Sequence, residues 1–336
     1  MKFVVTLVAS LLLTVPASAW TKSTIGSGGD YATLTLWENA VDGLSAGDYE
    51  AELISDISDA VTISGVTAGT NLWIHSAAGH RYKVTATAAQ MFYVNQTTDA
   101  LSVLVEDVEF DANATGADSA WYIRRLTGPF TARRCIIHNG TSYGVDIENA
   151  ALANTPTVTF ENCLVYDFSA EGIFCNFAPI AQTVNITNCG VYDCLRGMFL
   201  CNDADLTINA RNSWFLNNST ADITMQGDSV LFAITNCVLS KSAVGGGTPD
   251  TSSGNAFSKT DYASYFVSPG SDFHLLADDN TLWGVNGDSG TTPATDLDGV
   301  TRTGDDIGPY DFAGGSSYIF QPNMNGNLTT LNGNMQ

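Results

Sequence analysis

Two aspartates in this 336-residue chain occupy matching positions, and paired carboxylates are the groups that most glycosidases use. Asp167 and Asp193 each follow a tyrosine and lie 26 residues apart. If their segments stack as neighbouring strands, the strand spacing of about 4.8 Å puts the carboxyl groups about 5 Å apart, as in retaining glycosidases. Asp167 and Asp193 are therefore catalytic candidates. Asn139 and Asn217 stand at the equivalent positions before and after, which favours the alternative of a polar turn.

A group of arginines offers a second chemistry, because a basic side chain can abstract a proton from an acidic polysaccharide. Only 13 residues of the chain are Lys or Arg, yet several of them lie close together. Arg134 is the candidate base. Aromatic rings and guanidinium groups that could bind a sugar ligand are Trp121, Tyr122, Arg124, Arg125 and Arg196. The alternative is that these arginines neutralise nearby acids, and Asp107, 27 residues before Arg134, predicts an ion pair between the two.

Metal binding has little support in the sequence. Asp296 and Asp298, in the phrase Asp-Leu-Asp-Gly, are similar to the start of a Ca²⁺ loop. The remaining ligands of such a loop are missing, which favours a turn that covers the last coil. The four histidines have no metal-ligand spacing, and no Cys-x-x-Cys occurs. We expect no cofactor, with Ca²⁺ as the one ion that the two aspartates could hold.

Charge and the first residues bear on where the protein acts. The formal net charge is -22, which argues against binding to nucleic acid or to anionic lipid. Residues 1–19 resemble a secretory signal peptide, with Lys2 before an apolar run and Ala17-Ser18-Ala19 as the cleavage site. We therefore expect a secreted protein with no membrane insertion after signal removal. A virion is the alternative location.

The elements that must position these residues are indicated by a repeated phrase, apolar-x-apolar-x-Asn-Cys. Its last position falls at 135, 163, 189, 213 and 237, in steps of 28, 26, 24 and 24 residues. Such a period is typical of a solenoid, in which each coil buries its apolar side chains only by stacking on the next. A second apolar segment after each phrase predicts two β segments per coil and a parallel β-helix of about eight coils. We expect the Asn amides to form a ladder at a bend.

The cysteines of the phrase are expected to form a column of buried thiols inside the coils. Of the seven cysteines, Cys189 and Cys194 are the pair most suited to a disulfide. The pattern predicts four further regions after the signal: an N-terminal cap over 20–50, the β-helix over 51–245, C-terminal coils and cap over 246–312, and an uncharged tail over 313–336. Asp30 is the expected N-cap of a short helix in the first region.

The opening phrase Gly28-Gly29-Asp30-Tyr31-Ala32-Thr33-Leu34 resembles the start of pectin-lyase-like right-handed β-helix proteins. The closing phrases of the chain resemble the ending of secreted and phage-encoded members: Asp272-Phe273-His274-Leu275, Asp296 to Arg302, and Asp306 to Asp311. The resemblance covers roughly residues 24–312. It implies an all-β, right-handed parallel β-helix solenoid with a short N-terminal capping helix and a C-terminal turn-rich cap.

The resemblance is specific for architecture and not for activity, because this fold carries lyases, hydrolases, esterases, adhesins and phage tail proteins. The hydrolase motifs of the family are missing here. We therefore expect a non-catalytic extracellular or virion-surface protein for attachment or assembly, with a polysaccharide, a cell-surface glycan or neighbouring subunits as partner. The alternatives are a polysaccharide lyase or glycoside hydrolase, and a structural subunit of a phage or extracellular filament. Residues 313–336 are the candidate segment for self-association.

Overall fold

The computed structural model of the chain describes most of the residues between Trp20 and Asp311. The described ranges are 20–96, 101–113, 119–126, 128–148, 157–176, 182–201, 206–226, 230–241, 244, 249–276, 287–288, 292–302 and 306–311. The predicted signal segment 1–19 and the predicted tail 313–336 lie outside them. Within the described ranges, no helix has the length and apolar character needed to span a bilayer.

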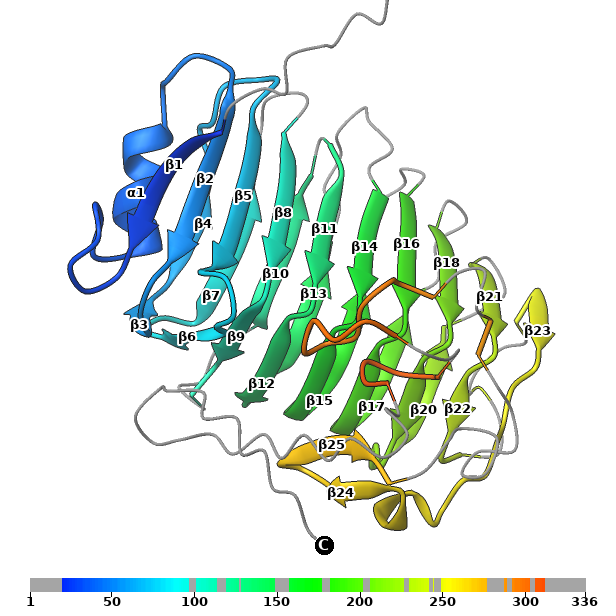
Figure 1. Cartoon of the computed structure of the whole chain (residues 1–336). Coiled ribbons are helices and arrows are strands. Elements are labelled where there is room, and N and C mark those ends of the chain that lie inside the picture. The colour runs from blue at the N-terminus through cyan, green and yellow to red at the C-terminus, as the bar shows by residue number, and fades with distance from the viewer. Residues whose placement is uncertain are drawn as a thin grey trace, which may run out of the picture.

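Most of the described coils of the solenoid contain three separate strands, where the sequence predicted two. One coil consists of β11 (Phe130–Arg133), β12 (Ile136–Gly140) and β13 (Tyr143–Ile147). Each strand pairs in parallel with its equivalents in the coils before and after (Figure 1). The middle strand follows the Asn-Cys phrase directly, where the sequence predicted a bend.

One side of the solenoid is a parallel sheet of ten strands among the described residues. Its strands, in spatial order around β11, are β1 (Thr21–Ile25), β2 (Asp48–Leu53), β5 (Asn71–Ser76), β8 (Ser102–Glu106), β11, β14 (Thr157–Glu161), β16 (Gln182–Thr187), β18 (Leu206–Arg211), β21 (Leu231–Thr235) and β23 (Thr251–Ser253). We call it the first sheet. The repeated phrase supplies its central strands, in register: Phe130 pairs with Val158, and Val158 with Val184.

The other two sides are joined, because β15 (Leu164–Cys175) and β17 (Gly190–Leu200) run across both. The middle column contains β3 (Ile57–Asp59), β6 (Tyr82–Ala86), β9 (Val108–Asp111), β12, the starts of β15 and β17, β19 (Trp214–Leu216) and β22 (Val238–Leu239). The last column contains β4 (Val61–Ile63), β7 (Gln90–Asn95), β10 (Ser119–Arg125), β13, the ends of β15 and β17, and β20 (Ala221–Met225).

The interior is a continuous apolar core with a column of thiols. Cys135, Cys163, Cys189 and Cys237 are buried and free, and the backbone N–H of Cys163 lies 3.4 Å from Cys189 Sγ. Burial raises the pKa of the Cys135 and Cys163 thiols well above the ordinary range. The predicted thiol column is therefore confirmed. The disulfide considered for Cys189 is wrong, since its thiol is free.

The Asn of each repeat lies at the corner between the first sheet and the middle column. Six residues there have φ between 46° and 57°, namely Asp107, Arg134, Asn162, Asn188, Asn212 and Asn236. Among residues with a side chain, Asn and Asp adopt this left-handed conformation most readily, which explains the repeated Asn. The predicted amide ladder between coils is wrong. Three of the Asn amides instead donate to the C-terminal segment: Asn162 to Thr295, Asn188 to Asp306 and Asn212 to Asp288.

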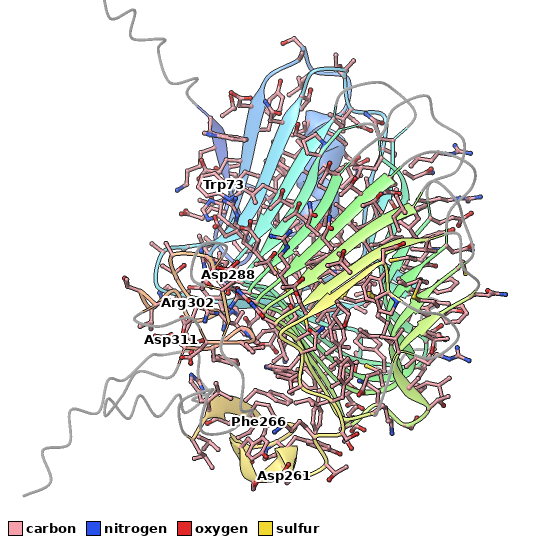
Figure 2. All side chains as sticks on the ribbon, turned by 90° about the vertical axis from the view of Figure 1, so that its right-hand side faces the viewer. Trp73, Asp261, Phe266, Asp288, Arg302 and Asp311 are labelled. Atoms are coloured by element: carbon pink, nitrogen blue, oxygen red, sulfur yellow. The ribbon has the colours of Figure 1, made fainter. Side chains whose placement is uncertain are left out.

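That segment, the C-terminal arm, comprises residues 287–288, 292–302 and 306–311. It runs back along the corner over several coils, as the orange trace in Figure 1 shows. Figure 2 shows Asp288, Arg302 and Asp311 together on this side of the molecule. The guanidinium of Arg302 bonds both Asn162 Oδ1 and the Gly308 carbonyl at 2.8 Å. The arm thus binds the solenoid through the Asn side chains that the left-handed backbone at the corner favours.

Other segments pack at the two ends. The helix α1 (Leu34–Val41) buries Leu34, Trp37 and Val41 against the first coil, and its N-cap is Thr33, whose hydroxyl accepts the N–H of Leu36 at 3.3 Å. Asp30, the predicted N-cap, instead accepts bonds from Thr24. Near the other end, the antiparallel hairpin of β24 (Phe266–Ser268) and β25 (Asp272–Leu275) packs its aromatic rings on Trp214 outside the middle column. The 3-10 turn η1 (Tyr262–Ser264) packs the Tyr262 ring on Tyr192.

Candidate functional site

The outward side of the last column carries a row of aromatic residues, which we call the aromatic face. In register over successive coils stand Tyr93 on β7, Tyr122 on β10, Asp146 on β13, Phe174 on β15 and Phe199 on β17. Side chains alternate between the two faces of a strand, so their neighbours fill the core while these five point outward. All five are half-buried.

The rings of the aromatic face lie nearly parallel to one another. Tyr93 stacks on Tyr122 with ring centroids 5.1 Å apart and planes at 12°. Phe174 stacks on Phe199 at 5.6 Å and 14°, and Tyr143 stacks on Phe174 at 4.8 Å and 13°. The result is two aromatic patches, each a stack of rings, with Asp146 between them in the row.

Charged groups border both patches. The Tyr122 hydroxyl donates to Glu148 Oε2, and Arg124 Nε lies 3.9 Å from the same oxygen. Burial, and next the bond to Glu148, raise the pKa of Tyr122 above the ordinary value. On the second patch, the Arg196 guanidinium lies 4.7 Å above the Phe199 ring and pairs with Glu171. These contacts hold the arginines and acids beside the rings, where their remaining polar atoms can bind hydroxyl groups.

Asp146 has the most unusual electrostatic environment of the face. Its pKa is raised to about 7, first by burial and then by the negative charge of Glu148, while a hydrogen bond with Ser119 opposes the rise. The charge of Glu171 adds to the same effect. Among the described residues, Asp146 Oδ1 is buried and has no hydrogen-bond partner. A carboxyl group with this pKa can hold a proton at neutral pH and give it to a ligand.

The structure brings some of the predicted ligand-binding residues together. Tyr122, Arg124 and Arg196 all lie on the aromatic face. Arg125 is the last residue of β10. It stands opposite Asn95 of β7 in the strand register and is half-buried. The prediction that Trp121 binds a ligand is wrong. This residue is 0% exposed, and its ring points inward and packs against Phe110 and Phe130. It cannot contact a ligand, since consecutive strand residues face opposite ways.

The two candidate aspartates lie away from the aromatic face, in the parts of β15 and β17 that belong to the middle column. Asp167 and Asp193 are exposed and left-handed, with φ of 61° and 52°, and Asn139 and Asn217 in the same column are left-handed and half-buried. Burial and then the neighbouring Asp167 raise the pKa of Asp193. Asn217 Nδ2 donates to Asp193 Oδ1 at 3.3 Å, and Asn217 Oδ1 accepts a bond from the Tyr262 hydroxyl at 2.6 Å. The backbone conformation alone accounts for the residue types here, so a catalytic role stays a prediction.

Arg134 is held by the acids that the sequence indicated. Its Nε and Nη2 lie 2.7 Å from the two carboxylate oxygens of Asp107, and Nη2 lies 2.9 Å from Glu106. These bonds raise the pKa of Arg134 further, although burial opposes the rise. A base must give up its proton, and this environment retains it. The predicted Asp107–Arg134 pair is confirmed. Two polar pockets of about 310 and 480 Å³ flank Arg134 and Thr295 of the C-terminal arm.

The two possible calcium ligands, Asp296 and Asp298, lie in a turn of the C-terminal arm. Asp296 Oδ1 accepts the N–H groups of Asp298 and Val300 at 3.0 and 2.8 Å. Asp298 accepts from His274 Nε2 at 2.8 Å and pairs with Arg81 at 3.4 Å. Both carboxylates therefore have structural partners in the turn, and binding of Ca²⁺ there stays a prediction.

Sequence reasoning missed four members of the aromatic face: Tyr93, Asp146, Phe174 and Phe199. Two features of the sequence could have indicated these residues. Each lies between two buried strand residues, and each recurs at the coil spacing. The coils before residue 130 lack the Asn-Cys phrase, which hid the alignment of Tyr93 with Tyr122.

Comparison with known proteins agrees with this architecture. Residues 103–261 match the family model described as a right handed beta helix region. Among solved structures, a crystal structure of pectate lyase Pel9A aligns over 88% of this chain and 97% of its own, with a TM-score of 0.42 and 11% identity. A search of curated proteins finds no match. With three parallel strand columns and a match to this family model over residues 103–261, the chain has the right-handed parallel β-helix fold that its opening and closing phrases predict.

Proposed function

We propose that the protein binds a polysaccharide or cell-surface glycan through the aromatic face, and that it serves attachment outside the cell or on a virion. The observation that carries the proposal is the set of half-buried, nearly parallel rings in register over neighbouring coils. Flat apolar rings suit the faces of sugar rings, and bordering carboxylates and guanidinium groups suit their hydroxyls.

Cross-strand stacking also stabilises a sheet, so the test must separate ring contacts with a ligand from stability. The probe is a panel of neutral and acidic polysaccharides, with affinity measured by electrophoresis in the polysaccharide gel and by calorimetry. We expect Tyr122→Ser and Phe174→Ser each to weaken binding about tenfold, equivalent to about 1.4 kcal/mol. Tyr122→Phe keeps the ring and should keep most of the affinity. Thr159→Ser, on the outward side of the first sheet, is the matched control.

Each result bears on the proposal. Binding that survives both serine substitutions, in variants that remain folded by circular dichroism, would place the ligand on another surface. Failure of the wild-type protein to bind any member of the panel would remove the glycan as the partner. Loss of affinity in Tyr122→Phe equal to that in Tyr122→Ser would assign the effect to the hydroxyl and its bond with Glu148.

A glycoside hydrolase is the second candidate, and one observation favours it. Asp146, with its pKa near 7, stands beside Glu148 and Glu171 on the face that holds the rings. General acids in glycosidases have pKa values raised in this way. The assay is the release of reducing ends from the polysaccharides that bind. Turnover that Asp146→Asn abolishes, with binding retained, would replace attachment with hydrolysis. The same assay on Asp193→Asn and Arg134→Ala tests the two other candidate centres.

A further inference from the structure

A second cluster of chemically active side chains lies far from the aromatic face, on the outward side of the first sheet. Glu50 and Glu52 are on β2, His75 is on β5, and Glu52 pairs in register with His75. One ligand atom from each of the three residues lies within 4.8 Å of the others. Among the described residues, no other set of three such groups lies so close.

The hydrogen bond of His75 to the backbone fixes which ring nitrogen carries a proton. His75 Nδ1 lies 2.8 Å from the Ser76 carbonyl oxygen, which can only accept, so Nδ1 is the donor. In the neutral ring, Nε2 then carries a lone pair, and it is directed at Glu50 Oε1, 3.0 Å away. Two acceptors at this distance need a proton or a metal ion between them. His75 is buried, with 9% of the residue exposed.

The surroundings of His75 match those of a metal-binding histidine. Such a histidine donates its second ring N–H to a backbone carbonyl or carboxylate, which orients the ring and fixes the tautomer. Trp73 stacks on the imidazole with centroids 4.1 Å apart and planes at 23°, and so restricts its rotation. Glu50 is 8% exposed. Two negative charges and one imidazole nitrogen thus converge at a restricted point.

Lys22 covers this point from β1. Its Nζ lies 2.7 Å from Glu52 Oε1 and 3.5 Å from Glu50 Oε1, and its side chain is 46% exposed. The ammonium group therefore partly neutralises the two carboxylates. A flexible, half-exposed lysine can move into solvent at little cost when a stronger cation arrives.

We propose that Glu50, Glu52 and His75 form a binding site for a divalent transition-metal ion of the Zn²⁺ class. An imidazole nitrogen with two carboxylates suits such ions, whereas Ca²⁺ takes oxygen ligands alone. Three protein ligands leave one tetrahedral position for water. The bound ion joins β2 to β5 and displaces the Lys22 ammonium.

The chain supplies a matched control. His138 Nε2 lies 3.1 Å from Glu109 Oε1, and the His138 ring stacks on Tyr166 at 5.0 Å. This pair repeats the histidine, the carboxylate and the aromatic neighbour, but it is not part of a three-ligand set among the described residues. A substitution of His138 should therefore leave metal binding unchanged.

The test is calorimetric titration of ZnCl₂ into the metal-free, full-length protein. Wild type should bind one ion per chain, and His75→Ala and Glu52→Gln should each weaken binding at least tenfold. His138→Ala should match wild type. Lys22→Met should bind up to about fivefold more tightly, because it removes a competing half-exposed ion pair. Glu52→Gln keeps the side-chain shape, so it remains informative if His75→Ala fails to fold.

Nuclear magnetic resonance of the histidine ring gives an independent readout. Zn²⁺ should shift the ¹⁵N resonance of His75 Nε2 and leave the Nδ1 proton in place. Absence of saturable binding would overturn the proposal, as would binding that both His75→Ala and Glu52→Gln retain. An imidazolium that keeps both ring protons in excess Zn²⁺ would assign the contact to a simple ion pair with Glu50.

Discussion

Asn188 combines two structural requirements that substitutions can separate. Its φ of 51° is left-handed, and its side-chain amide donates to the Asp306 and Gly308 carbonyls of the C-terminal arm at 2.7 and 3.3 Å. Asn236 has the same backbone conformation, with φ of 49°. No bond from its side chain to the described part of the arm is present. Glycine accepts this conformation, so Asn188→Gly removes the bonds to the arm and Asn236→Gly does not.

The expected magnitudes follow from these contacts. In either position glycine loses more backbone entropy on folding but avoids the strain that a side chain meets at this φ, so the two effects offset each other to within about 1 kcal/mol. Each hydrogen bond lost at Asn188 costs about 1 kcal/mol net, because Arg302 still bonds both carbonyls. Asn188→Gly should therefore lower the free energy of unfolding by about 2 kcal/mol more than Asn236→Gly, which should change it by less than about 1 kcal/mol.

Equilibrium unfolding in urea, followed by tryptophan fluorescence and circular dichroism, measures both values. Coincident transitions are needed, since a solenoid can unfold in parts. Limited proteolysis provides a local readout: the arm should be cleaved faster in Asn188→Gly than in Asn236→Gly. If the two variants are equally stable and equally resistant to proteolysis, the corner side chains do not hold the arm, and their role is confined to the backbone.

Three further predictions concern the core, the arm and the corner. Trp121→Ala should cost about 3–5 kcal/mol in urea unfolding because it empties a buried site, whereas a loss below about 1 kcal/mol would contradict the inward orientation. Bonds to Asp272 and Asp298 outweigh the opposing effect of burial and raise the pKa of His274 to about 9. Its stabilising contribution is thus complete below about pH 6.5 and declines as the pH rises through 9, and His274→Gln should abolish that dependence of urea stability. Asp107→Arg should cost about 1–3 kcal/mol, since it places two guanidinium groups together; equal stability would refute the ion pair.

The sequence predicted the architecture because the solenoid repeats its physical requirements. The coils from β8 onward need inward apolar residues and a left-handed corner, so Val158, Val184 and Ile208 recur at the coil spacing, and Asn follows β14, β16, β18 and β21. The third strand was missed because its residues change most between coils. Ile136 aligns with Leu164, and Leu164 with Gly190.

The C-terminal arm could not be predicted, because its contacts have no period. Asn212 bonds Asp288, 76 residues later, whereas Arg134 bonds Thr295 across 161 residues and Arg81 bonds Asp298 across 217. The partners grow farther apart in sequence because the arm runs back along the solenoid. Only the Asp107–Arg134 pair, within one corner column, follows from the coil spacing.

The fold also decides which residues carry information about function. At a left-handed corner, Asp167 and Asp193 are residue types that the backbone itself favours, so their presence needs no catalytic explanation. On the outward side of the last column, the backbone accepts many polar and β-branched residues, as Thr224 opposite Phe199 shows. Aromatic rings there leave apolar surface in contact with water, which the core does not require. Residues that the fold does not explain are the stronger evidence of a ligand, and on this chain they are the rings of the aromatic face.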